Sequence, residues 1–188
     1  MPITIVPFLM KEHLDETVQV LLRVREANPT YPPPLDTDVG VALFTEWLLK
    51  DETICKWVAV ADGKVVGHVA LSNAHEYILS FLASTEHKEL QADNLCEVTK
   101  LFVDPLAQGS GVARSLLLHA LSSAVALSRI PAFVVVAGSE AAKKALDESP
   151  YEEAGAFNGI HGINYVFLGS PGDQSQFSKP KVYFPSSS

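Results

Sequence analysis

The chain lacks any hydrophobic run that reaches the roughly 18 apolar residues a membrane-spanning helix needs. Its first apolar stretch, residues 3–10, has no basic segment before it and is followed at once by Lys11 and Glu12, so we expect no secretory signal. Cysteine is scarce, and Cys55 and Cys96 form no CxxC pair, which argues against a disulfide scaffold or a zinc site. We therefore expect a cytoplasmic protein that uses no metal and binds no membrane.

Basic residues are outnumbered, with 14 Lys and Arg against 22 Asp and Glu and a formal net charge of -8. A general nucleic-acid binder needs a basic face to neutralise phosphates, so we expect no nucleic-acid partner. A cationic or amine partner fits this charge better, although a surplus of acid also serves solubility alone. The 188 residues are enough for one compact domain with a substantial core.

Hydrophobic periodicity predicts an α/β order of elements. Residues 53–60 and 64–72 are rich in β-forming types, and Asp62-Gly63 between them predicts a hairpin of two antiparallel strands. The segment 73–95 is harder to interpret, although residues 77–84 are compatible with a helical turn. The other expected elements are strands at 2–8, 96–104, 132–137 and 164–169 and helices at 11–27, 41–50, 111–128 and 139–148.

The helix expected from residue 111 begins on a run of small residues, Gln108-Gly109-Ser110-Gly111. The first N–H groups of a helix have no intrahelical acceptor, and the helix dipole favours an anion there, so a phosphorylated ligand is expected. A dinucleotide-binding loop would have a third glycine where Arg114 stands, and a P-loop would end in Gly-Lys-Ser or Gly-Lys-Thr. A glycine-rich turn without a ligand is a further alternative.

Three stretches together resemble the GNAT superfamily of N-acetyltransferases. The run QGSGVA at 108–113 is similar to that family's Q/R-x-x-G-x-G/A signature, and EVTKLFVDP at 97–105 is similar to its fourth strand, E-I/V-x-x-L-x-V-x-P. The segment YEEAGAF at 151–157 resembles its Y-E-K-x-G-F segment, with one residue inserted. The resemblance covers about residues 2–169.

This resemblance implies a single-domain α/β fold with a mixed central sheet, splayed fourth and fifth strands, and helices on both faces. It places an acyl-CoA N-acyltransferase domain at 1–169 and a C-terminal extension at 170–188. Acetyl-CoA would be the co-substrate, with pantetheine bonded to the fourth strand, the thioester carbonyl polarised by the Val103 N–H, and the pyrophosphate held by the backbone of 108–114. The implied cofactor contacts are Leu101, Phe102, Val103, Gln108, Gly109, Ser110, Gly111, Val112, Ala113, Arg114 and Ser139.

A lysine-like amine has a pKa near 10.4 and is protonated at pH 7, so a base must remove a proton before the amine attacks a thioester. The resemblance implies Glu97 as that base and Tyr151 as the acid that protonates the CoA thiolate; a strand-end ion pair and a packing tyrosine are the respective alternatives. The pattern departs from the family near Tyr151, because Pro150 precedes it and Gly138-Ser139 replace an asparagine after the fifth strand. By analogy, the loop at 31–38 lines the acceptor cleft.

The sequence thus predicts an N-acetyltransferase that moves an acetyl group from acetyl-CoA to a primary amine by direct attack. The acceptor is a small-molecule or peptide amine, and a homodimer is an open option. A catalytically inert acyl-CoA sensor or interaction module is the alternative, since it needs the amide cradle but no base at Glu97. The six histidines show no metal-ligand spacing; His119 is expected at the surface, and His68 is expected to be packed or at a sheet edge.

Overall fold

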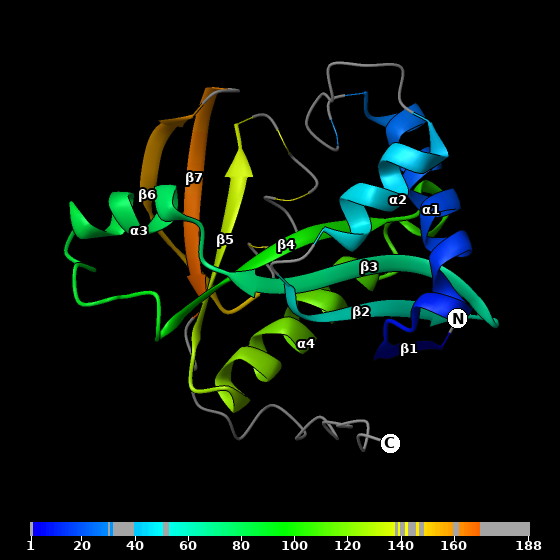
Figure 1. Cartoon of the computed structure of the whole chain (residues 1–188), viewed down its shortest axis with the longest axis horizontal. Helices are drawn as coiled ribbons and strands as arrows, with labels where there is room; N and C mark the ends of the chain where they lie inside the picture. Colours follow the sequence, from blue (N-terminus) through cyan, green and yellow to red (C-terminus); the bar gives the residue numbers. More distant parts are fainter. Residues whose placement is uncertain are drawn as a thin grey trace. The chain divides into compact units, whose positions relative to one another are not determined.

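The structure is a computed structural model that describes residues 2–29, 31, 40–50, 53–137, 139, 142, 146, 149–159 and 162–169. Within these residues the strands form one seven-stranded sheet in the order β1-β2-β3-β4-β5-β7-β6 (Figure 1). The elements are β1 (Ile3–Pro7), α1 (Met10–Ala27), α2 (Val41–Leu49), β2 (Thr53–Ala61), β3 (Lys64–Asn73), α3 (Glu76–Ala83), β4 (Leu95–Val103), η1 (Pro105–Ala107), α4 (Val112–Ala126), β5 (Ile130–Val136), β6 (Tyr151–Gly159) and β7 (Gly162–Gly169).

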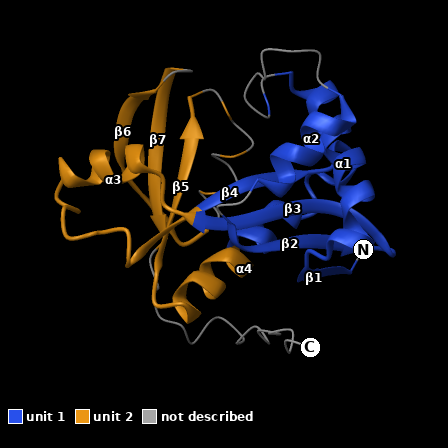
Figure 2. Cartoon of the chain, viewed as in Figure 1, with its two compact units in different colours: residues 1–72, 98–117 blue, residues 73–97, 118–188 orange. Residues whose placement is uncertain are grey.

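The chain divides into two compact units (Figure 2). Unit 1 consists of Met1–Ser72 and Val98–Leu117, and unit 2 consists of Asn73–Glu97 and Leu118–Ser188. Each unit therefore combines segments that are far apart in the sequence. Strand β4 and helix α4 each begin in one unit and end in the other.

The hairpin of β2 and β3 in unit 1 confirms the turn expected at Asp62-Gly63. These two residues have φ values of 49° and 74°, the left-handed conformation that a two-residue type I′ turn requires. The strands pair antiparallel from Ala61 opposite Lys64, and β1 pairs antiparallel with β2. The register slips between Ala59 and Val60, as at a β-bulge.

Helices lie on both faces of the strands of unit 1. Helices α1 and α2 cover one face, where their apolar side chains form a cluster with β2, β3 and β4. On the other face, a Cβ added to Gly67 would lie 3.0 Å from Val112 Cγ1 and 3.1 Å from Leu116 Cδ1, so glycine allows the start of α4 to approach β3 closely. The cluster on the first face consists of Val18, Val20, Leu21, Val24, Phe44, Leu48, Val58, Val65 and Phe102.

Unit 2 is built on the antiparallel pairs β5·β7 and β6·β7. Helix α3 packs on one face through Ile78 and Leu82, which are fully buried. Helix α4 packs nearby, since a Cβ on Gly169 would come within 2.7 Å of Leu121 Cδ1. In β6 the register slips between Glu153 and Gly155, beside the ring of Phe81.

The expected strands and helices outside 139–148 are confirmed, but β6 was not among the expected strands, and two further expectations differ. The segment 73–95 contains the eight-residue helix α3 rather than a single turn, because its apolar residues are buried against the sheet. His119 is half-buried rather than exposed, because α4 is apolar around much of its circumference, and this burial lowers the pKa of His119. Most of the helix expected at 139–148, and all of 170–188, lie outside the described residues.

None of the helices in the described ranges is long and apolar enough to cross a membrane. The splaying of the fourth and fifth strands, the domain boundary at residue 169 and the cytoplasmic location stay predictions.

Candidate functional site

The segment between β4 and α4, in unit 1, presents open backbone amides. Gly109 and Gly111 have φ values of 77° and 83°, and a Cβ built on either would meet nothing within 4 Å. Among the described residues, no acceptor takes a hydrogen bond from the N–H groups of 109–113, and the helical pattern starts where Ser115 donates to the Gly111 carbonyl at 3.0 Å. We call residues 108–114 the amide cradle, because N–H groups at a helix start attract anions.

The side chains of the amide cradle differ in exposure and in their contacts. Gln108 and the two glycines are exposed, whereas Val112 is buried and anchors the start of α4. The Ser110 hydroxyl donates to the carbonyl of Ala107, so it closes the turn locally. Arg114 is exposed on the first turn of α4. The cradle therefore offers mainly backbone donors to a ligand.

A buried carboxylate holds the chain at the entrance to the amide cradle. Asp104 directly follows β4; its Oδ2 accepts hydrogen bonds from Nε of Arg23 on α1 at 3.0 Å and from Nη2. Its Oδ1 accepts from the N–H of Leu106 at 3.0 Å and caps η1. Burial alone would raise the pKa of Asp104, but the bonds from Arg23 and Leu106 and the charge of Arg23 lower it below its usual value. The sequence analysis missed this pair, whose members are 81 positions apart.

A buried histidine fixes the backbone of β4 just before Leu101, Phe102 and Val103. Lys100 has a φ of 53°, which is irregular for a strand, and its carbonyl accepts a hydrogen bond from His68 Nδ1 at 2.9 Å. Since a carbonyl only accepts, Nδ1 carries the proton, and the buried Nε2 has no partner among the described residues. The His68 ring stacks on Phe102 at 5.2 Å, and burial lowers the pKa of His68 to about 4. His68 is therefore neutral and packed.

Glu97 lies in the part of β4 that belongs to unit 2, and its side chain is 6% exposed. The Tyr77 hydroxyl donates to Glu97 Oε1 at 3.0 Å, and the His75 N–H donates to Oε2 at 3.4 Å. Burial, the charge of Glu97 and this hydrogen bond raise the pKa of Tyr77 above its usual value. The carboxylate is thus oriented by donors at the start of α3, an arrangement that suits a proton acceptor.

Tyr151 begins β6, also in unit 2, where it pairs with Gly169. Its hydroxyl is buried and has no hydrogen-bond partner among the described residues. Burial, with a contribution from Cys96, raises the pKa of Tyr151 above its usual value. A raised pKa keeps the phenol protonated at neutral pH, as a proton donor must be, but also makes it a weaker acid, so the roles of general acid and of packing residue both stay open.

Two further candidate regions are described only in part. Ser139 follows β5 and donates its N–H to the Val136 carbonyl at 3.2 Å. Within the loop at 31–38 only Tyr31 is described; its ring packs against Trp47 at 6.2 Å, and burial raises its pKa. The remainder of that loop lies outside the described residues, so its expected part in acceptor selection stays a prediction.

The sequence analysis missed Tyr77 and His75, which surround the predicted base. The available signal was the spacing of Tyr77 and Phe81, four positions apart, which places two aromatic rings on one face of a helix.

Comparison with known proteins agrees with the resemblance found in the sequence. The model of the acetyltransferase (GNAT) family matches residues 21–147. Among curated proteins, none matches the chain.

Several solved structures share the fold. RimJ of Mycobacterium smegmatis, in complex with CoA-disulfide, matches with a TM-score of 0.67 and 14% identity over 88% of this chain and 80% of that one. The ribosomal-protein-alanine N-acetyltransferase of Brucella melitensis has a TM-score of 0.64 and 18% identity, covering 88% and 97%. YncA of Salmonella typhimurium, with its cofactor acetyl-CoA, has a TM-score of 0.62 and 13% identity, covering 89% and 92%.

Proposed function

The chain belongs to the GNAT family of acetyltransferases, and from that premise we propose that it transfers the acetyl group of acetyl-CoA to a primary amine. The observation that carries the proposal is the amide cradle, whose N–H groups at 109–113 have no acceptor among the described residues. Gly109 and Gly111, which both have positive φ, have no side chain that would cover these donors. A diphosphate has the charge and the oxygen acceptors that such a helix start binds.

The residues present fit acetyl-CoA as the co-substrate. The backbone of the amide cradle would hold the pyrophosphate, and Leu101, Phe102 and Val103 at the end of β4 would hydrogen-bond the pantetheine arm like a neighbouring strand. Arg114 and Ser139 are further candidate contacts. Asp104 and His68 touch none of these groups in our proposal; they position the backbone that does.

Acetyl-CoA supplies the acetyl group as a thioester. In the proposed reaction Glu97 takes a proton from the ammonium group of the acceptor, and the neutral nitrogen then attacks the carbonyl carbon. The Val103 N–H stabilises the negative charge on the carbonyl oxygen. A C–N bond forms as the C–S bond breaks, Tyr151 gives a proton to the departing sulfur, and the second proton that the nitrogen loses restores Tyr151. The products are an amide, the free CoA thiol and one proton.

The acceptor cannot be carried over from the structural neighbours. They include a ribosomal-protein-alanine N-acetyltransferase and an aminoglycoside acetyltransferase in complex with coenzyme A and kanamycin, at 18% and 13% identity. Because these acceptors differ widely on one fold, the fold alone says nothing about the amine.

The test combines thermal stabilisation by CoA with detection of free thiol in a screen of primary amines. We expect CoA to raise the melting temperature and at least one amine to release thiol from acetyl-CoA. Stabilisation without thiol release for any small-molecule, peptide or protein amine would favour an inert acyl-CoA sensor. Absence of stabilisation would contradict both functions.

A further inference from the structure

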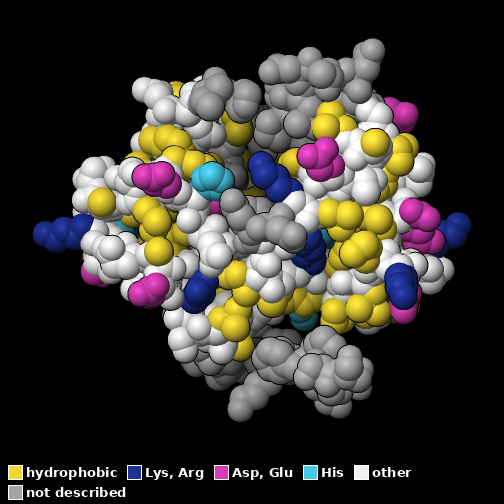
Figure 3. Space-filling model, in the orientation of Figure 1, with side chains coloured by type: hydrophobic (Ala, Val, Ile, Leu, Met, Phe, Trp, Pro, Cys, Tyr) yellow, Lys and Arg dark blue, Asp and Glu magenta, His cyan; other side chains and the backbone are white. Residues whose placement is uncertain are grey.

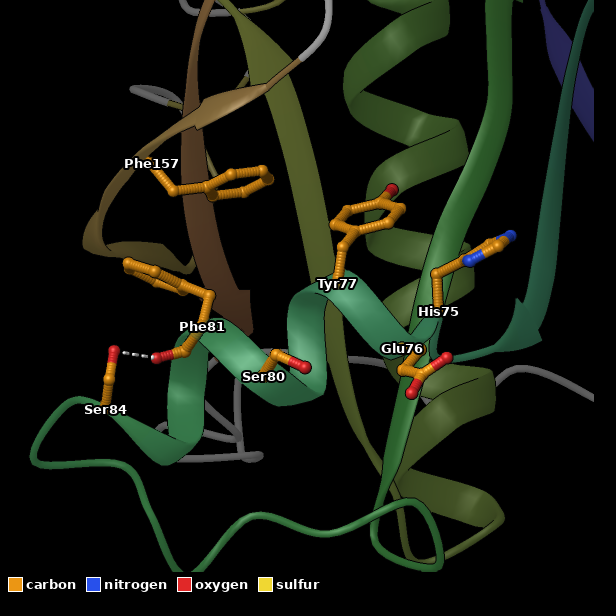
Figure 4. Close-up of a pocket in the computed structure, with 7 residues that line it drawn as sticks. All are labelled: His75, Glu76, Tyr77, Ser80, Phe81, Ser84 and Phe157. Atoms are coloured by element: carbon orange, nitrogen blue, oxygen red, sulfur yellow. Dashed lines mark hydrogen bonds between the residues drawn. The ribbon is translucent and has the colours of Figure 1, made fainter.

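An open groove of about 710 Å³ lies on the surface of unit 2 between α3 and β6. Figure 4 shows its lining, in which every residue but Phe157 comes from α3 or its two ends. In Figure 3, hydrophobic side chains gather over the part of this face where Figure 1 labels α3 and β6. The lining residues are His75, Glu76, Tyr77, Ser80, Phe81, Ser84 and Phe157.

Aromatic rings form a continuous row along this groove. Tyr77 and Phe157 lie 5.7 Å apart between ring centroids, Phe157 and Phe81 lie 5.5 Å apart, and His75 stacks on Tyr77 at 5.2 Å. Tyr77 is 42% exposed, so its ring faces the groove although its hydroxyl is bonded inward. Such a row offers apolar area together with the electron-rich faces that attract organic cations.

Tyr77 connects the groove to the predicted base. Its ring lines the groove, and its hydroxyl donates to Glu97 Oε1 at 3.0 Å. A molecule lying against the Tyr77 ring is therefore one side chain away from the Glu97 carboxylate. Glu97 itself does not line the groove; it lies directly behind the Tyr77 hydroxyl.

The charge of the lining residues favours a cationic ligand over an anionic one. Glu76 is its acidic member, and the lining contains neither Lys nor Arg. A carboxylate or phosphate would meet no Lys or Arg in this lining, whereas an ammonium group would meet aromatic faces and the Glu76 carboxylate.

From these observations, and resting on the function proposed above, we propose that the groove binds the body of the acceptor, a primary amine carried on an aromatic ring. The ring of the amine lies among Tyr77, Phe81 and Phe157. Its ammonium group points to the end of the groove where Tyr77 contacts Glu97. Tyr77 is then a binding residue through its ring and a positioning residue through its hydroxyl.

The test compares 2-phenylethylamine with ethanolamine, which present the same amine on an aromatic and on a polar body. Thiol release gives kcat and KM for each amine, and calorimetric titration of each amine into the CoA-bound protein gives a binding constant without turnover. We expect kcat/KM to be at least tenfold higher for 2-phenylethylamine. In Phe157→Ala the KM and Kd of 2-phenylethylamine should rise about tenfold, while those of ethanolamine stay unchanged.

Two further variants separate the roles within the groove. Ile163→Ala is the matched control, because Ile163 is an exposed hydrophobic residue on neighbouring β7, at 46%, and does not line the groove. It should change neither constant. Tyr77→Phe keeps the ring, so KM should hold; kcat should fall, and the acid limb of its pH profile should move to higher pH because ionised Glu97 loses a donor.

Equal kcat/KM values for the two amines, or a preference that survives in Phe157→Ala, would overturn the proposal while leaving the acetyltransferase function intact. If no amine releases thiol, the proposed function fails, and the calorimetric Kd still decides the groove: binding of 2-phenylethylamine that is lost in Phe157→Ala supports it. A third outcome is that the wild type binds no amine but dimerises with rising concentration, and that Phe157→Ala abolishes this dimerisation. This outcome would assign the groove to a second copy of the chain and overturn the proposal.

Discussion

The two units of the molecule present chemically different surfaces. Unit 1 offers backbone N–H groups at 109–113, next to an ion pair between the partly exposed Arg23 and the buried Asp104. Unit 2 offers side chains: the Glu97 carboxylate with its Tyr77 donor, and a row of aromatic rings. In the proposed function, the backbone donors recognise a group common to every acyl-CoA, whereas side chains can differ from one acceptor to the next. The contrast then teaches that binding of the shared substrate and choice of the variable one rest on different kinds of atoms.

The most severe test of this contrast is Glu97→Gln, which removes the proposed base from unit 2. We expect turnover with an amine to fall by about 10²–10⁴-fold, the usual contribution of a general base. Affinity for acetyl-CoA should not change, because the amide cradle is untouched. Steady-state thiol release and calorimetry measure the two quantities, and full turnover across the pH range would exclude Glu97 from the mechanism.

The converse test is Gly111→Ala, which places a side chain beside the donors of unit 1. At a φ of 83° an alanine strains the backbone by roughly 1–2 kcal/mol, and the added Cβ occupies space that the pyrophosphate needs. We expect acetyl-CoA affinity to fall by roughly tenfold or more, with folding retained, since that Cβ meets no atom within 4 Å.

Gly40→Ala is the matched control for this change. Gly40 also has open space around its Cβ position but an ordinary φ of -105°, so its substitution should leave CoA binding unchanged and cost only the small stability expected of an alanine at the N-cap of α2. Calorimetric titration with CoA, beside a thermal melt, compares the two variants. Equal CoA affinity in Gly111→Ala and wild type would remove the amide cradle as the binding site.

A smaller effect is expected from Asp104→Asn, which loosens the support of the cradle without touching it. Asp104 is buried but the Arg23 side chain is 41% exposed, so loss of the charge should lower the free energy of unfolding by only about 1–2 kcal/mol and raise the KM for acetyl-CoA severalfold. The folded-state pKa of Asp104 lies below its ordinary value of 3.8, so this stabilisation is present above that pH and is lost as the pH falls further. Urea titrations of wild type and variant from pH 7 to pH 3 should therefore converge at the acid end. A constant difference would contradict the assignment.

The smallest effect at neutral pH is expected at His68. Its pKa is about 4 in the folded state against 6.5 in the unfolded chain, so the unfolded state binds more protons between these values. The free energy of unfolding should therefore fall by on the order of 3 kcal/mol as the pH drops from 6.5 to 4. His68→Gln should flatten this part of the profile, with CoA binding at pH 7 little changed. An identical acid slope in wild type and variant would show that other groups are responsible.

Much of the fold could be predicted because it depends on local patterns. The Asp62-Gly63 turn, the helical periodicity of α1 and the apolar run of β5 are short-range signals that tertiary packing did not override. The amide cradle was predictable for the same reason, since consecutive small residues at a helix start specify backbone geometry directly.

The support and the selectivity of the site were not predictable in this way. Arg23 meets Asp104 across 81 positions, and Tyr77 meets Glu97 across 20, so neither pair leaves a pattern in a local window. The His68 contact with the Lys100 carbonyl depends on the φ of 53° at Lys100, and no glycine or asparagine in the sequence marks that position as unusual. These contacts are set by how elements pack, and a single sequence does not specify which distant side chains meet.

Gly155 makes the shape of the aromatic groove depend on a residue outside its lining. A Cβ at this position would lie 3.0 Å from Phe81 Cζ, so even an alanine would displace that ring and with it the floor against which Phe157 rests. Its φ of 133° adds a second penalty for any other residue. Divergence at this one position during evolution would therefore alter the shape of the groove, and in our proposal the amines that fit it, even between descendants whose groove residues are identical.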